Sequence, residues 1–294
     1  MTHVPIIVVT GATSGIGQLA AIELARRGAH IVFIARNEAR AATTRATIEA
    51  AAPGTRVDVH YADFANLDTV ASAAHEISSS YERIDVLINN AGIHAFEQRI
   101  TTDGFAEMIA VNYVAPWLLT NILRKKMIES APSRIVTVAS EASRRAGDFV
   151  PRRAILDRTP FTRLGSSKMY GQTKLMNIMF SLELARQLQA TGVAVNCLCP
   201  GFNVTGLGRE LGFAAVLERV LRTLNIGNPE RGAGIIVKLA TDPEFGLVSG
   251  GYFSVKDTKP LVPIAAGNDI SARKELWSIT SALLSERWPV PAAP

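Results

Sequence analysis

The chain has 294 residues, of which 48% are hydrophobic and 19% charged, a composition typical of a soluble globular α/β protein with a large core. Lysine and arginine total 31 against 26 acidic residues, giving a net charge of +5. Seven basic and three acidic residues fall within residues 141–169, so the excess predicts one basic loop and excludes the broad basic face of a nucleic-acid-binding protein.

The two cysteines, Cys197 and Cys199, alternate along a short apolar run and would face the same side of a strand, an arrangement poorly suited to a disulfide between them. A reduced, cytoplasmic setting is therefore expected. No basic segment precedes the first apolar run, and no apolar run reaches the ~18 residues needed to span a membrane. We expect neither a membrane span nor a metal site.

Seven short apolar runs rich in β-branched residues predict strands at residues 6–10, 30–36, 57–62, 84–89, 134–140, 193–198 and 251–255. Segments with helical spacing lie between them, such as 16–27 and 169–190, each followed by a glycine that can end a helix. This alternation predicts a doubly wound α/β fold, in which about seven parallel strands carry helices on both faces, as a single domain over residues 1–294. Such folds bind ligands at the carboxyl ends of the strands.

Three segments depart from the alternation. Residues 141–166 contain prolines and glycines with weak periodicity, which predict a long loop on the substrate side. Residues 202–228 contain a short amphipathic segment bracketed by glycines, typical of a mobile lid. A C-terminal helical extension is expected over 268–294, with a helix at 271–286 and a frayed tail after Arg287.

The first predicted strand runs into T-G-A-T-S-G-I-G, where three glycines are spaced G-x-x-x-G-x-G ahead of a helix. Glycine permits a tight turn and a close approach of the backbone to a ligand, and a helix N-terminus offers free N–H groups to a pyrophosphate. This turn between a strand and a helix predicts dinucleotide binding. The expected contacts are Gly11, Thr13, Ser14, Gly15, Ile16 and Gly17.

The end of the second predicted strand indicates which dinucleotide binds. NAD sites generally place an acid here for the ribose 2′-hydroxyl, whereas NADP sites need positive charge for the 2′-phosphate. This chain has Ala35 and Arg36 at that point. We therefore expect NADP(H), with Arg36 as a contact and Arg40 as a second candidate; the alternative for Arg36 is a solvated surface arginine.

Two further strand ends are expected to line the cofactor groove. Asp63 would accept a hydrogen bond from the adenine amine, beside Phe64; the alternative for Asp63 is an N-cap of the next helix. Consecutive asparagines after an apolar strand are costly unless bonded, so N-N-A-G at 89–92 predicts ties between neighbouring strands. The expected cofactor contacts in this motif are Asn90, Ala91 and Gly92.

Tyr170 and Lys174 lie four positions apart in a predicted helix, and therefore on one helix face. A free phenol has a pKa near ~10, which a neighbouring cation lowers. Carbonyl reduction places negative charge on oxygen, which needs a nearby donor. The pair predicts a general acid, Tyr170, assisted by Lys174, with a chance pairing as the alternative. Gly171 costs a helix interior ~1 kcal/mol, which suggests a close approach by substrate or by neighbouring backbone.

With these residues, the sequence resembles the short-chain dehydrogenase/reductase family. The family's motifs occur in order over essentially the whole chain: T-G-x-x-x-G-x-G at 10–17, N-N-A-G at 89–92, Asn112, Ser140, Tyr170-x-x-x-Lys174 and Pro200-Gly201. Short segments such as V-N-C-L-C-P-G and V-S-G-G-Y-F-S are similar to the corresponding segments of the retinol-dehydrogenase-like and carbonyl-reductase branch. The first predicted strand is preceded by no anchoring segment, so a retinoid substrate is not expected.

The resemblance implies reversible hydride transfer between a carbonyl or alcohol and the nicotinamide. It implies that Ser140 donates to the substrate oxygen and that Asn112 holds a water that relays protons to Lys174, which also bonds the nicotinamide ribose. Ser143 is a second candidate donor. The catalytic group is therefore expected to be Asn112, Ser140, Tyr170 and Lys174. The cofactor contacts implied near the nicotinamide are Tyr170, Lys174, Pro200, Gly201 and Thr205.

The predicted function is an NADP(H)-dependent reductase of a bulky, largely hydrophobic ketone or aldehyde. Apolar side chains near the basic loop support this substrate class: Phe149, Phe161, Phe202, Phe213 and Leu217. Reduction is favoured because NADPH is typically kept reduced in cells. Two alternatives stay open: the same site used for an epimerisation, dehydration or cyclisation, and a non-catalytic NADP-sensing regulator.

Two properties follow less directly from the sequence. The loop arginines would meet an anionic or polyphenolic substrate, contact an acidic carrier protein, or form a solvated rim; they are Arg144, Arg145, Arg152, Arg153, Arg158 and Arg163. Helices matching 105–130 and 169–190 pair subunits in the family. This implies a homodimer or homotetramer, unless the insertion before Tyr170 obstructs the contact.

Overall fold

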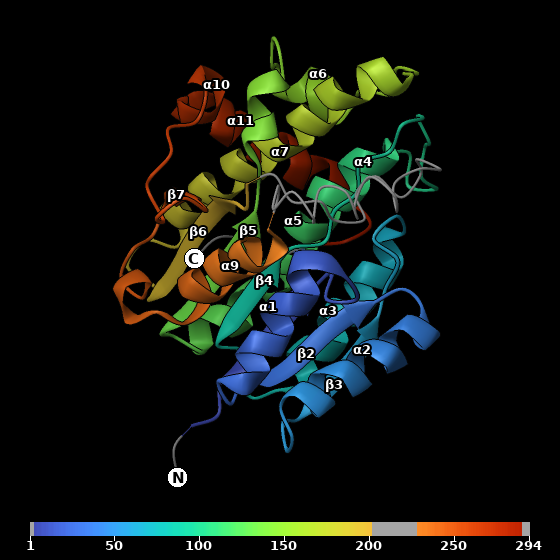
Figure 1. The fold of residues 1–294 in the computed structure, drawn as a ribbon. Coiled ribbons are helices and arrows are strands. Elements are labelled where there is room, and N and C mark those ends of the chain that lie inside the picture. Colours follow the sequence, from blue (N-terminus) through green and yellow to red (C-terminus); the bar gives the residue numbers. More distant parts are fainter. Residues whose placement is uncertain (1–2, 202–227, 290–294) are drawn as a thin grey trace.

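Seven parallel strands form one sheet in the order β3-β2-β1-β4-β5-β6-β7 (Figure 1). The structure, a computed structural model, describes residues 3–201 and 228–289. The strands are β1 (Ile6–Thr10), β2 (His30–Ala35), β3 (Val57–Tyr61), β4 (Val86–Asn89), β5 (Ser133–Val138), β6 (Val193–Cys199) and β7 (Gly251–Ser254). The predicted doubly wound, single-domain α/β fold is confirmed, because all seven strands lie where the apolar runs placed them.

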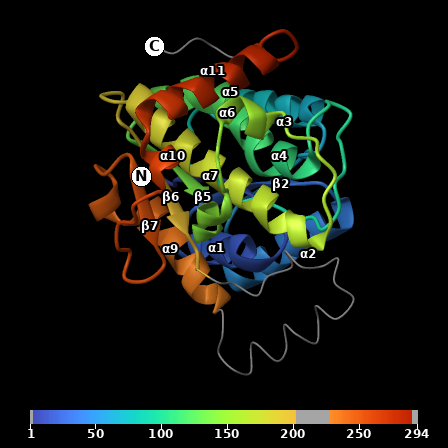
Figure 2. The same ribbon diagram turned by 90° about the horizontal axis from the view of Figure 1, so that it is seen from above.

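Helices cover both faces of the sheet (Figures 1 and 2). One face carries α1 (Gly15–Arg26), α2 (Glu38–Ala51) and α9 (Pro229–Thr241). The other carries α3 (Leu67–Ser80), α5 (Ala115–Glu129) and α7 (Arg163–Gln187). The shorter or peripheral helices are α4 (Glu107–Ile109), a π-helix (Ala110–Val114), two 3-10 helices (Glu141–Arg145 and Pro243–Phe245), α6 (Pro151–Ile155), α10 (Ala265–Asn268) and α11 (Ile270–Leu284).

Strand β1 shows how the side chains divide between the two layers. Val8 packs with the cluster that includes α3, α5 and α7, whereas Ile7 and Val9 pack with the cluster that includes α1, α2 and α9. All three side chains are fully buried. Because β1 lies between β2 and β4, the strand order reverses beside it, and ligands of doubly wound sheets bind at that point.

The segment 141–166 is not the single long loop that was predicted. It contains a 3-10 helix and α6, and α7 begins at Arg163 rather than near Met169. Pro151 starts α6 because its fixed φ and missing N–H suit the first helical position. Ala154 and Ile155 are buried, and α6 packs on α11. These helical turns depend on tertiary contacts and are too short to show a clear apolar period.

The chain after α11 is anchored where a frayed tail was predicted. Trp288 is 9% exposed, and its Nε1 donates to Asp68 Oδ1 at 2.9 Å. Arg287 lies 4.7 Å from the centre of the Trp288 ring and donates to Asp103 Oδ1 at 3.1 Å. The prediction of fraying is therefore wrong for Trp288. The predicted lid, 202–228, lies outside the described residues except for Asn228, which caps α9.

Helix α11 covers the outer face of α5 and α7 (Figure 2). The Trp277 ring lies 5.3 Å from the ring of Trp117 and stacks on Phe180 at 5.9 Å. Arg124 is 3% exposed, lies 5.9 Å from the centre of the Trp277 ring and donates to Gln187 at 3.1 Å. The C-terminal extension is therefore part of the core on this side of the sheet. Within the two described ranges, no helix combines the length and the apolarity needed to cross a bilayer.

Candidate active site

Tyr170 and Lys174 lie on one face of α7, next to the carboxyl end of β5. The Lys174 Nζ donates to the Val138 carbonyl at 2.9 Å and lies 5.7 Å from the centre of the Tyr170 ring. Lys174 is only 4% exposed, and this burial lowers the pKa of its ammonium group to about 8 because a charged amine is costly to desolvate. Lys174 therefore stays mostly protonated at neutral pH.

The Tyr170 phenol retains its proton in this structure. Burial raises its pKa above the ordinary value, and the nearby Cys199 sulfur shifts it in the same direction. The expected lowering of this pKa by Lys174 is therefore not found, because desolvation of the phenolate dominates. A protonated phenol is nevertheless the form that can donate a proton to a substrate oxygen.

Ser140 follows β5 and begins the 3-10 helix Glu141–Arg145. Its Oγ accepts a hydrogen bond from the Ala142 N–H at 3.1 Å. This short helix packs directly on α7 at Gly171, where an added Cβ would lie 2.6 Å from the Ala142 carbonyl oxygen and 3.1 Å from the Ala146 nitrogen. Neighbouring backbone therefore explains the glycine, and the contact holds Ser140 beside the turn that carries Tyr170. Ser143 is 2% exposed.

Asn112 lies in the π-helix ahead of α5 and is fully buried. Its Oδ1 accepts from the Ile93 N–H at 2.7 Å, and its Nδ2 donates to the Ile93 carbonyl at 2.9 Å. The same Nδ2 donates to Thr173 Oγ1 at 3.1 Å. A Cβ on Gly92 would lie 3.3 Å from Asn112 Oδ1 and 3.5 Å from Lys174 Nζ, so these groups adjoin. Asn112 thus joins the loop after β4 to α7, and its proton-relay role stays a prediction.

The glycine turn after β1 fits a pyrophosphate. Gly11 and Gly15 have φ values of +69° and +58°, which favour glycine. A Cβ on Gly17 would lie 2.2 Å from Asn90 Nδ2, so only hydrogen fits there. Helix α1 begins at Gly15 without an acidic residue in its first turn, and Ser14 makes no side-chain capping bond. The helix N-terminus is therefore open to an anion. The other predicted contacts that are partly exposed here are Thr13 and Ile16.

The two asparagines at the end of β4 tie neighbouring elements together, as predicted. Asn90 Nδ2 donates to the Thr10 carbonyl at 2.9 Å, and the N–H groups of Asn90 and Ala91 donate to Thr10 Oγ1 at 2.9 and 3.0 Å. Asn89 points the other way and donates to Thr120 Oγ1 at 2.9 Å. These bonds fix the end of β4 against β1 and α5. The partly exposed predicted contacts here are Asn90, Ala91 and Gly92.

Arg36 and Asp63 lie together at the ends of β2 and β3. The Arg36 side chain is 71% exposed, and its Nη1 lies 3.8 Å from Asp63 Oδ1. Asp63 also accepts from the Ala65 N–H at 3.0 Å, whereas Asn66 caps α3, so Asp63 is not the helix cap that was its alternative. The Phe64 side chain is 8% exposed and belongs to the core, which leaves only its backbone for a cofactor.

The end of β6 brings a cysteine to the site. Cys199 is 7% exposed, and its Sγ accepts from the Glu141 N–H at 3.3 Å. Pro200 and Gly201 follow it and are partly exposed, with Gly201 at φ +74°. Thr205, predicted at the nicotinamide, lies outside the described residues.

One ring at this site was not predicted from the sequence, that of His94. It stacks on Tyr170 with the ring centroids 4.6 Å apart. The available signal was its position two residues after N-N-A-G, at the carboxyl end of a central strand.

Two of the loop arginines make local bonds. Arg144 bonds Glu141 at 2.7 Å and the Val262 carbonyl at 3.1 Å, and Arg153 donates to the Asp148 carbonyl at 2.8 Å. These contacts favour the solvated-rim alternative for both residues. The side chains of the remaining loop arginines are exposed; these are Arg145, Arg152, Arg158 and Arg163.

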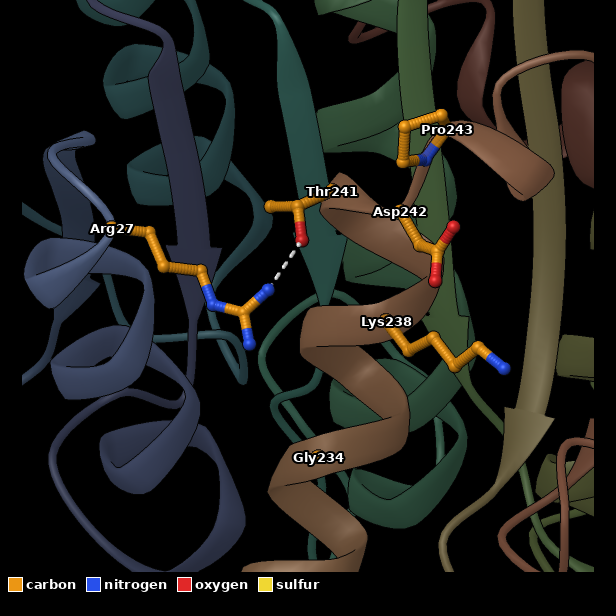
Figure 3. Close-up of a pocket in the computed structure, with 6 residues that line it drawn as sticks. All are labelled: Arg27, Gly234, Lys238, Thr241, Asp242 and Pro243. Carbon is orange, nitrogen blue, oxygen red and sulfur yellow. Dashed lines mark hydrogen bonds between the residues drawn. The ribbon is translucent and has the colours of Figure 1, made fainter.

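A separate hollow of about 470 Å³ lies where α1 and α9 end (Figure 3). Arg27 reaches across it and donates to Thr241 Oγ1 at 3.2 Å. Because both helices run back from the carboxyl ends of parallel strands, the hollow lies at the amino edge of the sheet, away from Tyr170. Its other lining residues are Gly234, Lys238, Asp242 and Pro243. In the described ranges, no three His, Cys, Asp or Glu side chains gather closely enough to hold a metal ion.

Similarity to known proteins indicates the family of the chain. The family profile described as short chain dehydrogenase matches residues 5–151. Retinol dehydrogenase 13 of Homo sapiens is 35% identical over 291 residues, which cover 96% of this chain and 85% of that protein.

Two solved structures are similar over most of the chain. An uncharacterized protein from Mycobacterium Paratuberculosis has a TM-score of 0.75 and 25% identity over 97% of this chain and 95% of its own. A protein described as an NAD(P) dependent gluconate 5-dehydrogenase from Beutenbergia cavernae, with NADP bound at low occupancy, has a TM-score of 0.67 and 29% identity over 85% of this chain and 94% of its own.

Proposed function

Because the chain belongs to the short-chain dehydrogenase/reductase family and is an oxidoreductase acting on CH–OH and C=O groups, we propose that it uses NADPH to reduce a bulky, largely hydrophobic ketone or aldehyde. The observation that carries the proposal is the placement of Tyr170 and Lys174. They share one face of α7 beside the strand ends, and the phenol there is protonated and partly exposed.

The chain offers a binding surface for the cofactor at the ends of β1, β2 and β4. The turn at Gly11–Gly17 would hold the pyrophosphate, Asn90 and Ala91 would line the groove, and Arg36 would meet a 2′-phosphate. Bound NADPH supplies the hydride. The NADP carried by the structurally similar Beutenbergia cavernae protein supports this choice of cofactor.

The proposed catalytic residues have separate roles at the substrate oxygen. Ser140 donates a hydrogen bond and polarises the carbonyl, and Tyr170 supplies the proton as negative charge develops. Lys174, protonated beside the ring, stabilises the phenolate that Tyr170 leaves behind. The purified chain should oxidise NADPH in the presence of a panel of bulky ketones and aldehydes. Retinal belongs in the panel because of the name of the human relative; failure with every member would contradict the proposal.

Arg36 should set the preference for NADPH. Arg36→Ala is expected to raise the KM for NADPH by about 10- to 100-fold, because a hydrogen bond to a charged group contributes ~1.5–3 kcal/mol. Arg36→Asp should move the preference toward NADH. The matched control is Arg56→Ala, since Arg56 is equally exposed at 71% but lies at the opposite end of β3. An unchanged ratio of kcat/KM for NADPH and NADH in Arg36→Asp would rule out this role.

We propose that the chain is a monomer in solution. In the family, the helices corresponding to α5 and α7 pair subunits, but here Trp277 of α11 packs on Trp117 and Phe180 of those helices. A second subunit would have to displace α11. Sedimentation should give a mass near 31.6 kDa. A dimer that persists at nanomolar concentration would contradict this.

A further inference from the structure

Three rings lie together beside the proposed acid. His94, in the loop after β4, stacks on Tyr170 with centroids 4.6 Å apart and ring planes at 16°. The Phe96 ring lies beside the same imidazole, with the two ring centroids 4.9 Å apart and the two ring planes at 33°. Both His94 and Tyr170 are only partly buried, so their stack lies at the accessible surface of the candidate site.

A hydrogen-bond chain fixes the histidine ring. Ser166 is fully buried one helical turn before Tyr170, and its Oγ donates to the Arg163 carbonyl at 2.8 Å. That hydroxyl proton is therefore committed, and the Ser166 oxygen accepts from His94 Nε2 at 3.1 Å. This contact is satisfied by a proton on Nε2, and it restrains the imidazole from turning freely.

The backbone next to His94 is held independently by Asn112. Both polar atoms of the Asn112 amide bond Ile93, at 2.7 and 2.9 Å. Asn112 also donates to Thr173 Oγ1, which donates to the Tyr170 carbonyl at 2.8 Å. The loop that presents the imidazole and the helical turn that presents the phenol are therefore joined through one buried amide.

We propose that His94 is a positioning residue that acts through Tyr170. The stacked imidazole limits swinging of the phenol about Cα–Cβ, which would move Oη, and fixes the ring plane, in which the phenolic O–H bond lies; both keep the proton aligned with the substrate oxygen. This inference rests on the proposed function, because it takes Tyr170 to be the proton donor. Stacking restricts rotation of the phenol about its side-chain bonds, and a misplacement of about 1 Å at a reacting group can cost up to ~10²-fold in rate.

Variants of His94 separate the ring from its hydrogen bond. His94→Leu removes both, His94→Gln keeps a donor for Ser166 without a ring, and His94→Phe keeps the ring without the donor. We expect kcat to fall about tenfold in His94→Leu and His94→Gln and to stay within about threefold of wild type in His94→Phe, while the Kd for NADPH is unchanged in all three. His75→Leu is the matched control, because His75 is an exposed histidine on α3.

A double-mutant cycle tests whether the effect passes through the phenol. In a Tyr170→Phe background, His94→Leu should change the residual single-turnover rate by less than about twofold, since no hydroxyl remains to be aligned. A kcat in His94→Leu equal to wild type would overturn the assignment. So would a His94→Phe variant as slow as His94→Gln, or an undiminished tenfold loss in the Tyr170→Phe background.

The same measurements distinguish failure of this inference from failure of the proposed function. Absence of turnover by the wild-type chain would overturn the proposed function and this assignment with it. An active wild type and an inactive Tyr170→Phe beside a fully active His94→Leu would overturn the positioning role alone. If His94→Leu does not fold, as judged by thermal unfolding, the comparison of His94→Gln with His94→Phe carries the test.

Discussion

Tyr170→Phe is expected to lower kcat for carbonyl reduction by ~10²–10⁴-fold, the range that a well-placed general acid contributes. The substitution removes one oxygen and keeps the ring that stacks on His94. The Kd for NADPH should therefore change by less than about threefold. Steady-state NADPH oxidation and titration of NADPH fluorescence would measure the two effects separately.

The matched control for this substitution is Tyr61→Phe. Tyr61 ends β3, is 49% exposed and lies next to α2 residues, away from α7. It should retain wild-type kcat. Equal rates in Tyr170→Phe and wild type would contradict proton donation by Tyr170. Loss of NADPH binding in the Tyr170→Phe variant would instead mean that the phenol serves the cofactor more than the substrate.

Gly171→Ala is expected to reduce both stability and activity, although alanine is the better helix former. Its Cβ would lie 2.6 Å from the Ala142 carbonyl oxygen and 3.1 Å from the Ala146 nitrogen, and backbone atoms cannot rotate away as a flexible side chain does. Overpacking of this kind costs ~1–3 kcal/mol in free energy of unfolding. The helix that starts at Ser140 must also move away from Tyr170, so we expect kcat to fall by more than ~10²-fold.

Gly234→Ala provides the control for Gly171→Ala. Gly234 also lies inside a helix, α9, but no atom outside its local neighbourhood lies within 4 Å of the added Cβ. Alanine there should leave kcat unchanged and raise the free energy of unfolding by up to ~1 kcal/mol. Chemical denaturation and NADPH oxidation measure both quantities. Similar kcat values and similar stabilities of the two glycine variants would contradict overpacking at Gly171.

Much of the scaffold was predictable because its signals are local. An apolar run such as 193–198 must be buried, and a parallel sheet between two helical layers is where a short run of this kind fits. Gly11, Gly15 and Gly17 could be recognised because the turn needs positive φ or a missing Cβ, requirements that only glycine meets. The ties made by the asparagines at the end of β4 were predictable because amide side chains next to a buried strand tend to be hydrogen-bonded.

Contacts between distant segments decided the rest. Helix α6 is only five residues long, which is too short for an apolar periodicity to predict it. Its packing on α11 stabilises it instead. Trp288 was expected to fray because its partner, Asp68, is far away in the sequence. The stack of His94 on Tyr170 likewise joins a loop and a helix that lie far apart in the sequence.

The sequence by itself determined the fold, the glycine turn after β1 and the pairing of Tyr170 with Lys174 on one helix face, since each depends on residue types at fixed short spacing. Only the tertiary structure decided the protonation of that pair. Burial lowers the pKa of Lys174 to about 8 and raises the pKa of Tyr170, the opposite of the shift expected for the phenol from its lysine neighbour alone. Desolvation depends on what every other segment packs around a group, and no local spacing encodes it.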